Sequence, residues 1–189
     1  MKKLIFTLAI LFSVASLSAQ KMWVGGTFGL WSSHNNGGDS ELSYKVLPEF
    51  GYVLNENLAV GLSIGGGHTH AGIGDSYSLD FQGTTSASSS VNFYRVNPFL
   101  RYSFLKGSLG ALFVDGGVAY GKVAFCGTGK DMDAFDVGFK PGIALNVSSK
   151  FVLIGKFGFL GYEHFDGSKN SFGFDFNLEN IEFGGAFKF

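Results

Sequence analysis

The chain has 189 residues and a formal net charge of -1 at pH 7, and its length suits one domain. This balance excludes a general nucleic-acid binder, which needs clustered positive charge. The lone cysteine, Cys126, excludes an internal disulfide, and 29 glycines with 22 phenylalanines favour a fold made of many strands.

The N-terminus predicts a secretory signal peptide. Two lysines precede an apolar stretch over 4–14, and a run rich in small residues follows over 15–19. The apolar stretch is too short to cross a bilayer as a helix, and no polar stripe supports the alternative of a buried N-terminal helix. We expect residues 1–19 to be a signal peptide cleaved after Ala19, and residues 20–189 to form the mature domain.

Apolar residues then recur at alternate positions, which is the period of a β-strand. No apolar run in this part is long enough for a membrane helix. The seventh stretch is apolar on both faces, and Lys156 marks its polar side. An even number of strands suits a closed antiparallel barrel. The eight stretches cover 22–30, 42–52, 58–65, 94–102, 112–121, 135–146, 151–164 and 181–189.

The connections alternate between short and long, which is typical of outer-membrane barrels with periplasmic turns and extracellular loops. The short ones are 54–57, 105–108 and 147–150, and the long polar ones are 33–40, 69–90, 126–133 and 165–171.

Three prolines, Pro48, Pro98 and Pro141, repeat on the apolar faces of strands that run toward short turns. Proline cannot donate a ladder hydrogen bond, so β-bulges at these sites are one way to accommodate them.

Alternation alone does not say which face points inward, and a secreted lipocalin-like barrel would hold its apolar face inside. The apolar faces supply roughly forty positions, too many for the interior of eight strands. Pairs of tyrosines also lie eight residues apart, which is ~20 Å along the membrane normal at a ~40° tilt and matches aromatic girdles. We therefore expect lipid around the apolar face. The girdle residues are Tyr44, Tyr52, Tyr94, Tyr102 and Tyr120.

The last strand places Phe183, Phe187 and Phe189 on one face. Together with the signal peptide and the eight alternating stretches, this resembles the small eight-stranded Gram-negative outer-membrane β-barrel family of the OmpX and OmpA membrane-domain type, over residues 20–189. The resemblance implies an all-β, antiparallel, up-and-down transmembrane barrel in contact with outer-membrane lipid and lipopolysaccharide. It also implies that the three phenylalanines form the signal read by the barrel-assembly machinery.

The face opposite the lipid carries ten charged residues, six positive and four negative. In a narrow lumen they must pair or reach water, because an unpaired buried ion costs several kcal/mol. We expect a paired network that plugs the lumen, and the alternative is a narrow, weakly anion-preferring pore lined by the surplus cations. The ten are Lys45, Glu49, Arg95, Arg101, Asp115, Asp136, Lys140, Lys156, Glu182 and Lys188.

Several polar side chains near the loops could in principle bind a metal or form a hydrolytic triad. They are His34, His68, His70, Asp75, Ser76, Glu163 and His164. His68 and His70 point the same way on a strand, so a metal could bridge them, but a structural site needs about four ligands. A triad of His68, Ser76 and Asp75 would suit a lipid A-modifying enzyme, but no spacing motif supports it. We expect no catalytic, cofactor or metal site.

The sequence therefore predicts a monomeric, non-enzymatic outer-membrane barrel with a structural or surface-interaction role, such as adhesion or protection. Exposed loops, with Trp31, His34 and the 35–38 turn, are where an extracellular ligand would bind. A narrow channel and a lipid A-modifying enzyme are the alternatives.

Overall fold

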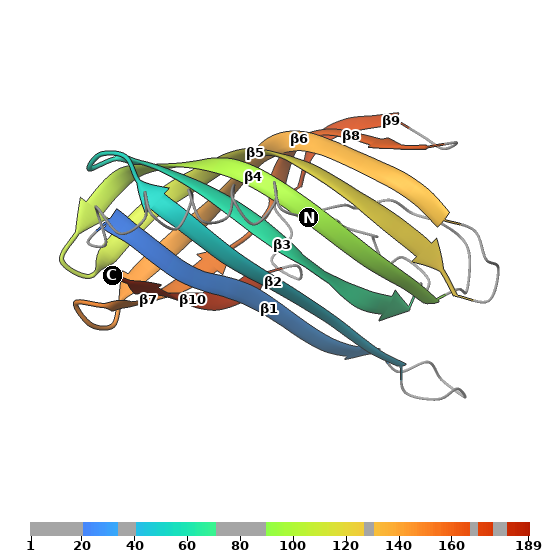
Figure 1. The fold of residues 1–189 in the computed structure, drawn as a ribbon, viewed down its shortest axis with the longest axis horizontal. Coiled ribbons are helices and arrows are strands. Elements are labelled where there is room, and N and C mark those ends of the chain that lie inside the picture. Colours follow the sequence, from blue (N-terminus) through green and yellow to red (C-terminus); the bar gives the residue numbers. More distant parts are fainter. Residues whose placement is uncertain (1–20, 34–40, 71–89, 127–130, 167–169, 176–180) are drawn as a thin grey trace, which may run out of the picture.

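The computed structural model describes residues 21–33, 41–70, 90–126, 131–166, 170–175 and 181–189. Within these ranges, no helix is both long and apolar enough to cross a membrane. The strands, shown in Figure 1, are β1 (Met22–Ser33), β2 (Glu41–Val53), β3 (Leu58–His70), β4 (Ser90–Gly107), β5 (Gly110–Phe125), β6 (Asp131–Asn146), β7 (Phe151–Lys156), β8 (Phe159–Phe165), β9 (Asn170–Asp175) and β10 (Glu182–Lys188).

The described strands close into an eight-stranded antiparallel barrel, which confirms the predicted fold class. Each strand from β1 to β6 pairs with the next, and β6 pairs with both β7 and β8, which follow one another along the chain. Strand β10 pairs with β7 on one side and β1 on the other, and this last contact closes the ring. Strand β9 extends the sheet beyond β8.

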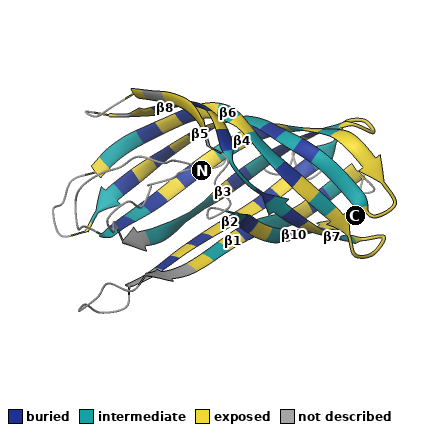
Figure 2. Cartoon of the chain, turned by 180° about the vertical axis from the view of Figure 1, so that it is seen from behind, coloured by how far each residue is buried: buried dark blue, intermediate teal, exposed yellow. Residues whose placement is uncertain are grey.

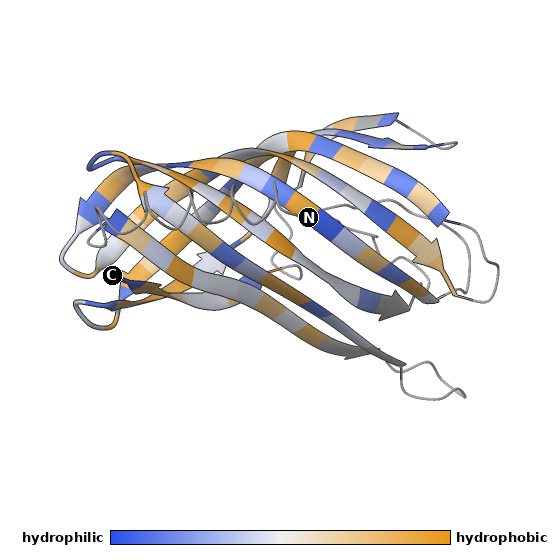
Figure 3. Cartoon of the chain, in the orientation of Figure 1, coloured by the Kyte–Doolittle hydropathy of each residue, from blue (hydrophilic) through white to orange (hydrophobic). Residues whose placement is uncertain are grey.

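The apolar face points outward and the charged face points into the barrel. Large apolar side chains such as Phe28, Leu100 and Phe139 are exposed, whereas Lys45 and Glu49 are buried. Buried and exposed residues, and likewise hydrophilic and hydrophobic ones, alternate along the strands (Figures 2 and 3). A lipocalin-like arrangement would need the opposite, so the structure excludes it.

The five predicted girdle tyrosines lie on the outer wall, with Tyr52 half-buried and the others exposed. Tyr52 and Tyr102 lie toward the end of the barrel that carries the short turns. Tyr44 and Tyr94 lie eight residues earlier on the same strands, toward the loops, and Tyr120 lies toward the loops on β5. Contact of these rings with lipid headgroups stays a prediction.

Two of the three short turns occupy the residues that the sequence indicates. In the turn over 54–57, the Asn55 side-chain oxygen accepts hydrogen bonds from the backbone of Asn57 and Leu58, both at 2.9 Å. In the turn over 147–150, the Ser148 hydroxyl accepts one from the Phe151 N–H at 3.0 Å. The turn predicted at 105–108 is misplaced: β4 runs to Gly107, because an irregularity between Ser103 and Leu105 shifts its register.

The strands reach further toward the loops than the alternation predicts. Strand β3 extends to His70, and β6 begins at Asp131, inside a predicted loop. The sequence prediction missed β9, which begins within the connection predicted over 165–171. The signal peptide at 1–19 and the loop segments 34–40, 71–89, 127–130, 167–169 and 176–180 lie outside the described residues.

The three prolines are accommodated in two ways. At Pro48 and Pro98, the ladder on one side is locally unpaired, but the register on either side of the gap is unchanged, so no bulge is present. At Pro141, the partner strand breaks between β8 and β7, and its register shifts by one residue. Since proline has no N–H to donate, the ladder is interrupted at each site where a hydrogen bond from that N–H would otherwise be needed.

The break at Pro141 also explains why the seventh stretch is apolar on both faces. Lys156 in β7 and Glu163 in β8 both point inward, although a separation of seven residues along a regular strand would place them on opposite faces. Gly158, at a φ of 70°, supplies the residue that reverses the alternation.

Inside the barrel, large aromatic rings lie on glycines of the neighbouring strand. Each ring and its glycine are directly opposite in the ladder, and a methyl group on the glycine would approach the ring to within 2.3–2.5 Å. These glycines thus leave the space that the rings fill. The pairs are Trp23 with Gly51, Phe99 with Gly61, and Phe113 with Gly142.

We expect Gly142→Ala to destabilise the barrel by about 1–3 kcal/mol, because Phe113 is 1 % exposed and its ring has little room to move. The measurement is the urea midpoint of unfolding in detergent micelles, followed by tryptophan fluorescence. Gly107→Ala is the control, since an added methyl there meets nothing within 4 Å. Equal midpoints for the two variants would contradict the ring-on-glycine packing.

Candidate functional site: the charged lumen

A closed ring of four ion pairs crosses the lumen. The Arg101 guanidinium on β4 contacts both carboxylate oxygens of Asp115 on β5, with Nε–Oδ1 at 2.7 Å and Nη2–Oδ2 at 2.8 Å. Lys156 on β7 lies 3.1 Å from Asp115 and also pairs with Glu49 on β2. The Arg101–Glu49 contact at 3.5 Å completes the ring. Two cations and two carboxylates from four separate strands therefore compensate one another.

A second cluster surrounds Glu182 on β10. Its Oε1 accepts from Lys45 Nζ at 2.8 Å and from Lys140 Nζ at 3.0 Å, and its Oε2 accepts from the Thr27 hydroxyl at 3.0 Å. The carboxylate is 2 % exposed, so these three donors replace the water that it would otherwise bind.

Three further buried charges lie in the same lumen. Arg95 and Asp136 line one small cavity with Lys140 and Glu182, and Glu163 lies opposite Asp136 in the β6–β8 ladder. Sequence reasoning did not count Glu163 as a lumen residue, because the reversal at Gly158 hides the face on which it lies. The alternation of β8 could have been read separately from that of β7.

Among the described residues, the charges in the central part of the lumen balance. Nine of the ten predicted charges point inward, but Lys188 is exposed at the turn end, where its Nζ lies 3.5 Å from Asn146 Oδ1. With Glu163 included, five cations face five carboxylates. The surplus of cations on which the anion-preferring pore depended is therefore absent from this described central part of the lumen, whereas Lys106, Lys188 and Glu56 line the cavity at the turn end.

Apolar layers lie on both sides of these charges. On the loop side, Val91, Phe93, Val123 and Ala134 form a buried cluster. On the turn side, the Arg101 guanidinium lies 4.9, 5.3 and 4.2 Å from the ring centres of Trp23, Phe99 and Phe113. Apolar surroundings lower the local dielectric constant, which strengthens each ion pair and penalises any unpaired charge. Sequence reasoning missed these inward aromatics, because its prediction for the lumen face named only charged residues.

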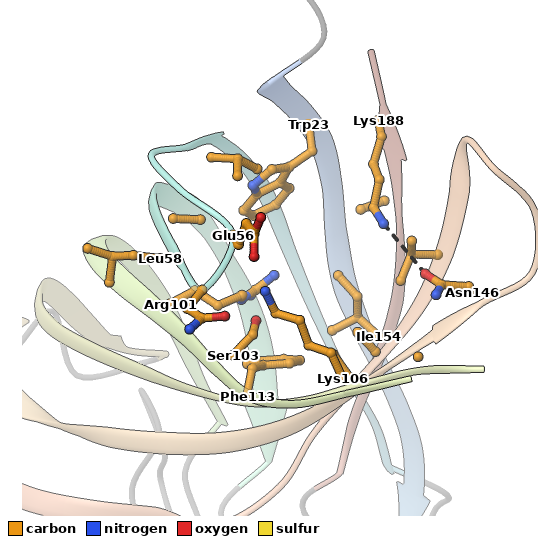
Figure 4. Close-up of a pocket in the computed structure, with 18 of the residues that line it drawn as sticks. Trp23, Glu56, Leu58, Arg101, Ser103, Lys106, Phe113, Asn146, Ile154 and Lys188 are labelled. Carbon is orange, nitrogen blue, oxygen red and sulfur yellow. Dashed lines mark hydrogen bonds between the residues drawn. The ribbon is translucent and has the colours of Figure 1, made fainter. Parts of the chain in front are cut away.

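The space among the charges is small. A cavity of about 20 Å³ lies between the two clusters, lined by residues that include Glu49, Arg95 and Glu182. That volume is close to what a single water molecule needs. A larger cavity of about 350 Å³ opens at the turn end, on the other side of Arg101 (Figure 4).

The candidate metal and triad residues do not converge where they are described. His68 Nδ1 lies 2.8 Å from Asn92 Oδ1, and its ring stacks on Tyr44. His164 is exposed on β8 while the adjacent Glu163 points inward. His34, Asp75 and Ser76 lie outside the described residues, as does the side chain of His70. Within the described ranges, no group of three or more histidine, cysteine or acidic residues could hold a metal ion.

The C-terminal phenylalanines occupy the outer wall beside the first strand. Phe183, Phe187 and Phe189 are exposed, and the Phe187 ring lies 4.8 Å from that of Phe151. The Phe189 N–H donates to the Met22 carbonyl at 2.9 Å, so the strand is paired to its end. Recognition of these rings by an assembly machinery stays a prediction.

The closed sheet of eight strands and its outward apolar face define a small eight-stranded transmembrane β-barrel. No family model and no curated protein matches the chain. Among solved structures, it is similar to Neisserial surface protein A, with a TM-score of 0.55 at 12% identity, covering 89% of this chain and 97% of that one. It is also similar to a structure of Ail, the attachment invasion locus protein of Yersinia pestis, in complex with the heparin analogue sucrose octasulfate. The TM-score for this pair is 0.46 at 13% identity, covering 89% of this chain and 97% of that one. At these identities the likeness concerns the fold.

We expect the four-membered ring to behave as one unit in a double-mutant cycle. Asp115→Leu alone should lower the free energy of unfolding by ~3–5 kcal/mol, because Arg101 and Lys156 lose a buried partner. The double variant Asp115→Leu, Arg101→Met should lose less free energy of unfolding than the two single variants together, by more than ~1 kcal/mol, since Lys156 and Glu49 still pair.

The matched control is the exposed pair Lys122 and Asp131, whose Nζ and Oδ2 lie 3.7 Å apart. The cycle of Lys122→Met and Asp131→Leu should give a coupling of about 0–1 kcal/mol in the same urea titrations. Additive effects of the Arg101 and Asp115 changes would show that the ring is not an energetic unit.

Proposed function

We propose that this protein is an integral outer-membrane barrel whose lumen is closed by ion pairs, and that it is neither an enzyme nor a channel. The observation that carries the proposal is the ring of Glu49, Arg101, Asp115 and Lys156. Every member is held by two others, and the four members lie on four different strands, β2, β4, β5 and β7. An ion crossing the lumen would have to separate these pairs within an apolar surround, which costs several kcal/mol for each charge exposed.

Outer-membrane residence is supported by the outward apolar belt together with the charged interior. In water, exposed side chains such as Phe28, Leu30, Phe183 and Phe187 would form a contiguous apolar surface that a monomer does not tolerate. A barrel satisfies its backbone hydrogen bonds internally, so the same surface is stable in lipid. Short turns at one end and longer connections at the other support an orientation with the turns in the periplasm.

A structural or surface-interaction role fits a closed barrel, because such a barrel acts through its fixed wall and its loops and not through its lumen. The ion pairs hold the strands in register, and the strands in turn hold the ends of the loops at fixed positions. Adhesion or protection through those loops is the particular role that we propose. The ligand that the loops bind would lie on the surface of another cell or of a host.

The channel alternative is separated from this proposal by conductance of the refolded mature protein in a planar bilayer. We expect no steady openings from the native protein, with folding checked by heat-modifiable gel migration and a general porin as the positive control. The double variant Arg101→Ala, Asp115→Ala should open small steps, because it removes both the ring and the guanidinium that lies against the three aromatic residues.

Steady openings from the native protein, shifted in size or ion preference by Lys140→Ala or Asp136→Ala, would overturn the closed lumen and support the channel. Release of lipid A fragments that ceases with His68→Ala or His164→Ala would overturn the non-enzymatic assignment.

A further inference from the structure

The cavity of about 350 Å³ at the turn end lies on the turn side of the ion-pair ring, and Arg101 is the member of the ring that lines it. Its inner wall is apolar: Trp23, Phe113, Val152, Ile154 and Ala186 line it, and all five are buried. The volume lies within the range of ~300–1,000 Å³ that is usual for small-molecule sites.

The cavity ends blindly at Arg101. That guanidinium contacts the rings of Trp23 and Phe113 and is neutralised by Asp115 and Glu49 on its far side. A molecule entering from the turn end therefore meets an aromatic and cationic surface and has no open path beyond it.

The mouth of the cavity carries a cation, Lys106, that makes no polar contact with the described part of the barrel. Lys106 lines the cavity and points into it (Figure 4), and it makes no hydrogen bond or ion pair with any residue that the structure describes. Among the described residues, Lys188 contributes a second ammonium, engaged only by the long 3.5 Å contact with Asn146, and Glu56 contributes the single carboxylate side chain that lines the cavity. The mouth therefore has a net positive charge above an apolar floor.

We propose that this cavity binds a small amphipathic anion, composed of an aromatic ring and one carboxylate, sulfonate or similar group. The ring would lie against Trp23 and Phe113, and the anionic group would accept hydrogen bonds from Lys106 at the mouth. Under the proposed orientation, the site opens to the periplasm. The binding itself does not depend on that orientation or on the closed lumen.

The test uses 2-naphthalenesulfonate as the probe, with the refolded protein in phosphatidylcholine nanodiscs. The readout is the NMR signal of the Trp23 indole N–H, assigned with Trp31→Phe because the chain has two tryptophans. We expect a saturable shift of that signal. The neutral 2-naphthylmethanol should bind about tenfold more weakly, and Lys106→Ala should weaken the sulfonate by a similar factor.

Lys150→Ala is the matched control, because Lys150 lies on a turn at the same end but does not line the cavity. It should leave the affinity within about twofold of the native value, since it removes the same charge without touching the ligand. The absence of a saturable Trp23 shift would overturn the site. Equal responses to the anionic and neutral probes, unchanged by Lys106→Ala, would indicate lipid partitioning and would overturn it equally.

Discussion

Charge compensation inside a narrow, apolar-flanked lumen is the constraint on which this barrel depends. The four members of the ring belong to β2, β4, β5 and β7, so they meet only when each wall strand holds its register. A slip of one residue would turn a charge such as Asp115 toward lipid and an apolar neighbour inward. The same alternation that satisfies the bilayer thus fixes the ion pairs, and the ion pairs penalise any other alignment of the strands.

The irregular points of the wall follow from that constraint. Lys156 and Glu163 are an odd number of residues apart, so one extra residue must intervene if both are to face inward. Gly158 provides it at a positive φ, opposite Pro141, where β6 has no N–H to donate to its neighbour. The break in the ladder lies where Pro141 already lacks a hydrogen-bond donor, and the consequence is that Lys156 and Glu163 both face the lumen.

Most of the fold could be predicted from the sequence because alternation specifies a face, and the choice of lipid or lumen then follows from volume and charge. The height of a side chain along the barrel axis does not follow from alternation. It depends on register and tilt, which is why the partners of Arg101 and the exposed position of Lys188 could not be derived. Glu163 was missed because the strand reverses its alternation at Gly158, and Trp23 because a lone aromatic residue on a glycine-rich face does not reveal the glycine beneath it.

The most direct test of the closed, ion-paired lumen is hydrogen exchange at the arginine side chains, because Arg95 and Arg101 are the two arginines in the chain and both face the lumen. The measurement is the exchange rate of the Arg101 Nε–H with water, by nitrogen-resolved NMR of the protein in nanodiscs near neutral pH. A donor held at 2.7 Å from Asp115 between aromatic rings should exchange at least about a hundredfold more slowly than free arginine. Exchange at the rate of free arginine would mean that water reaches the ring freely, and would contradict the closed lumen.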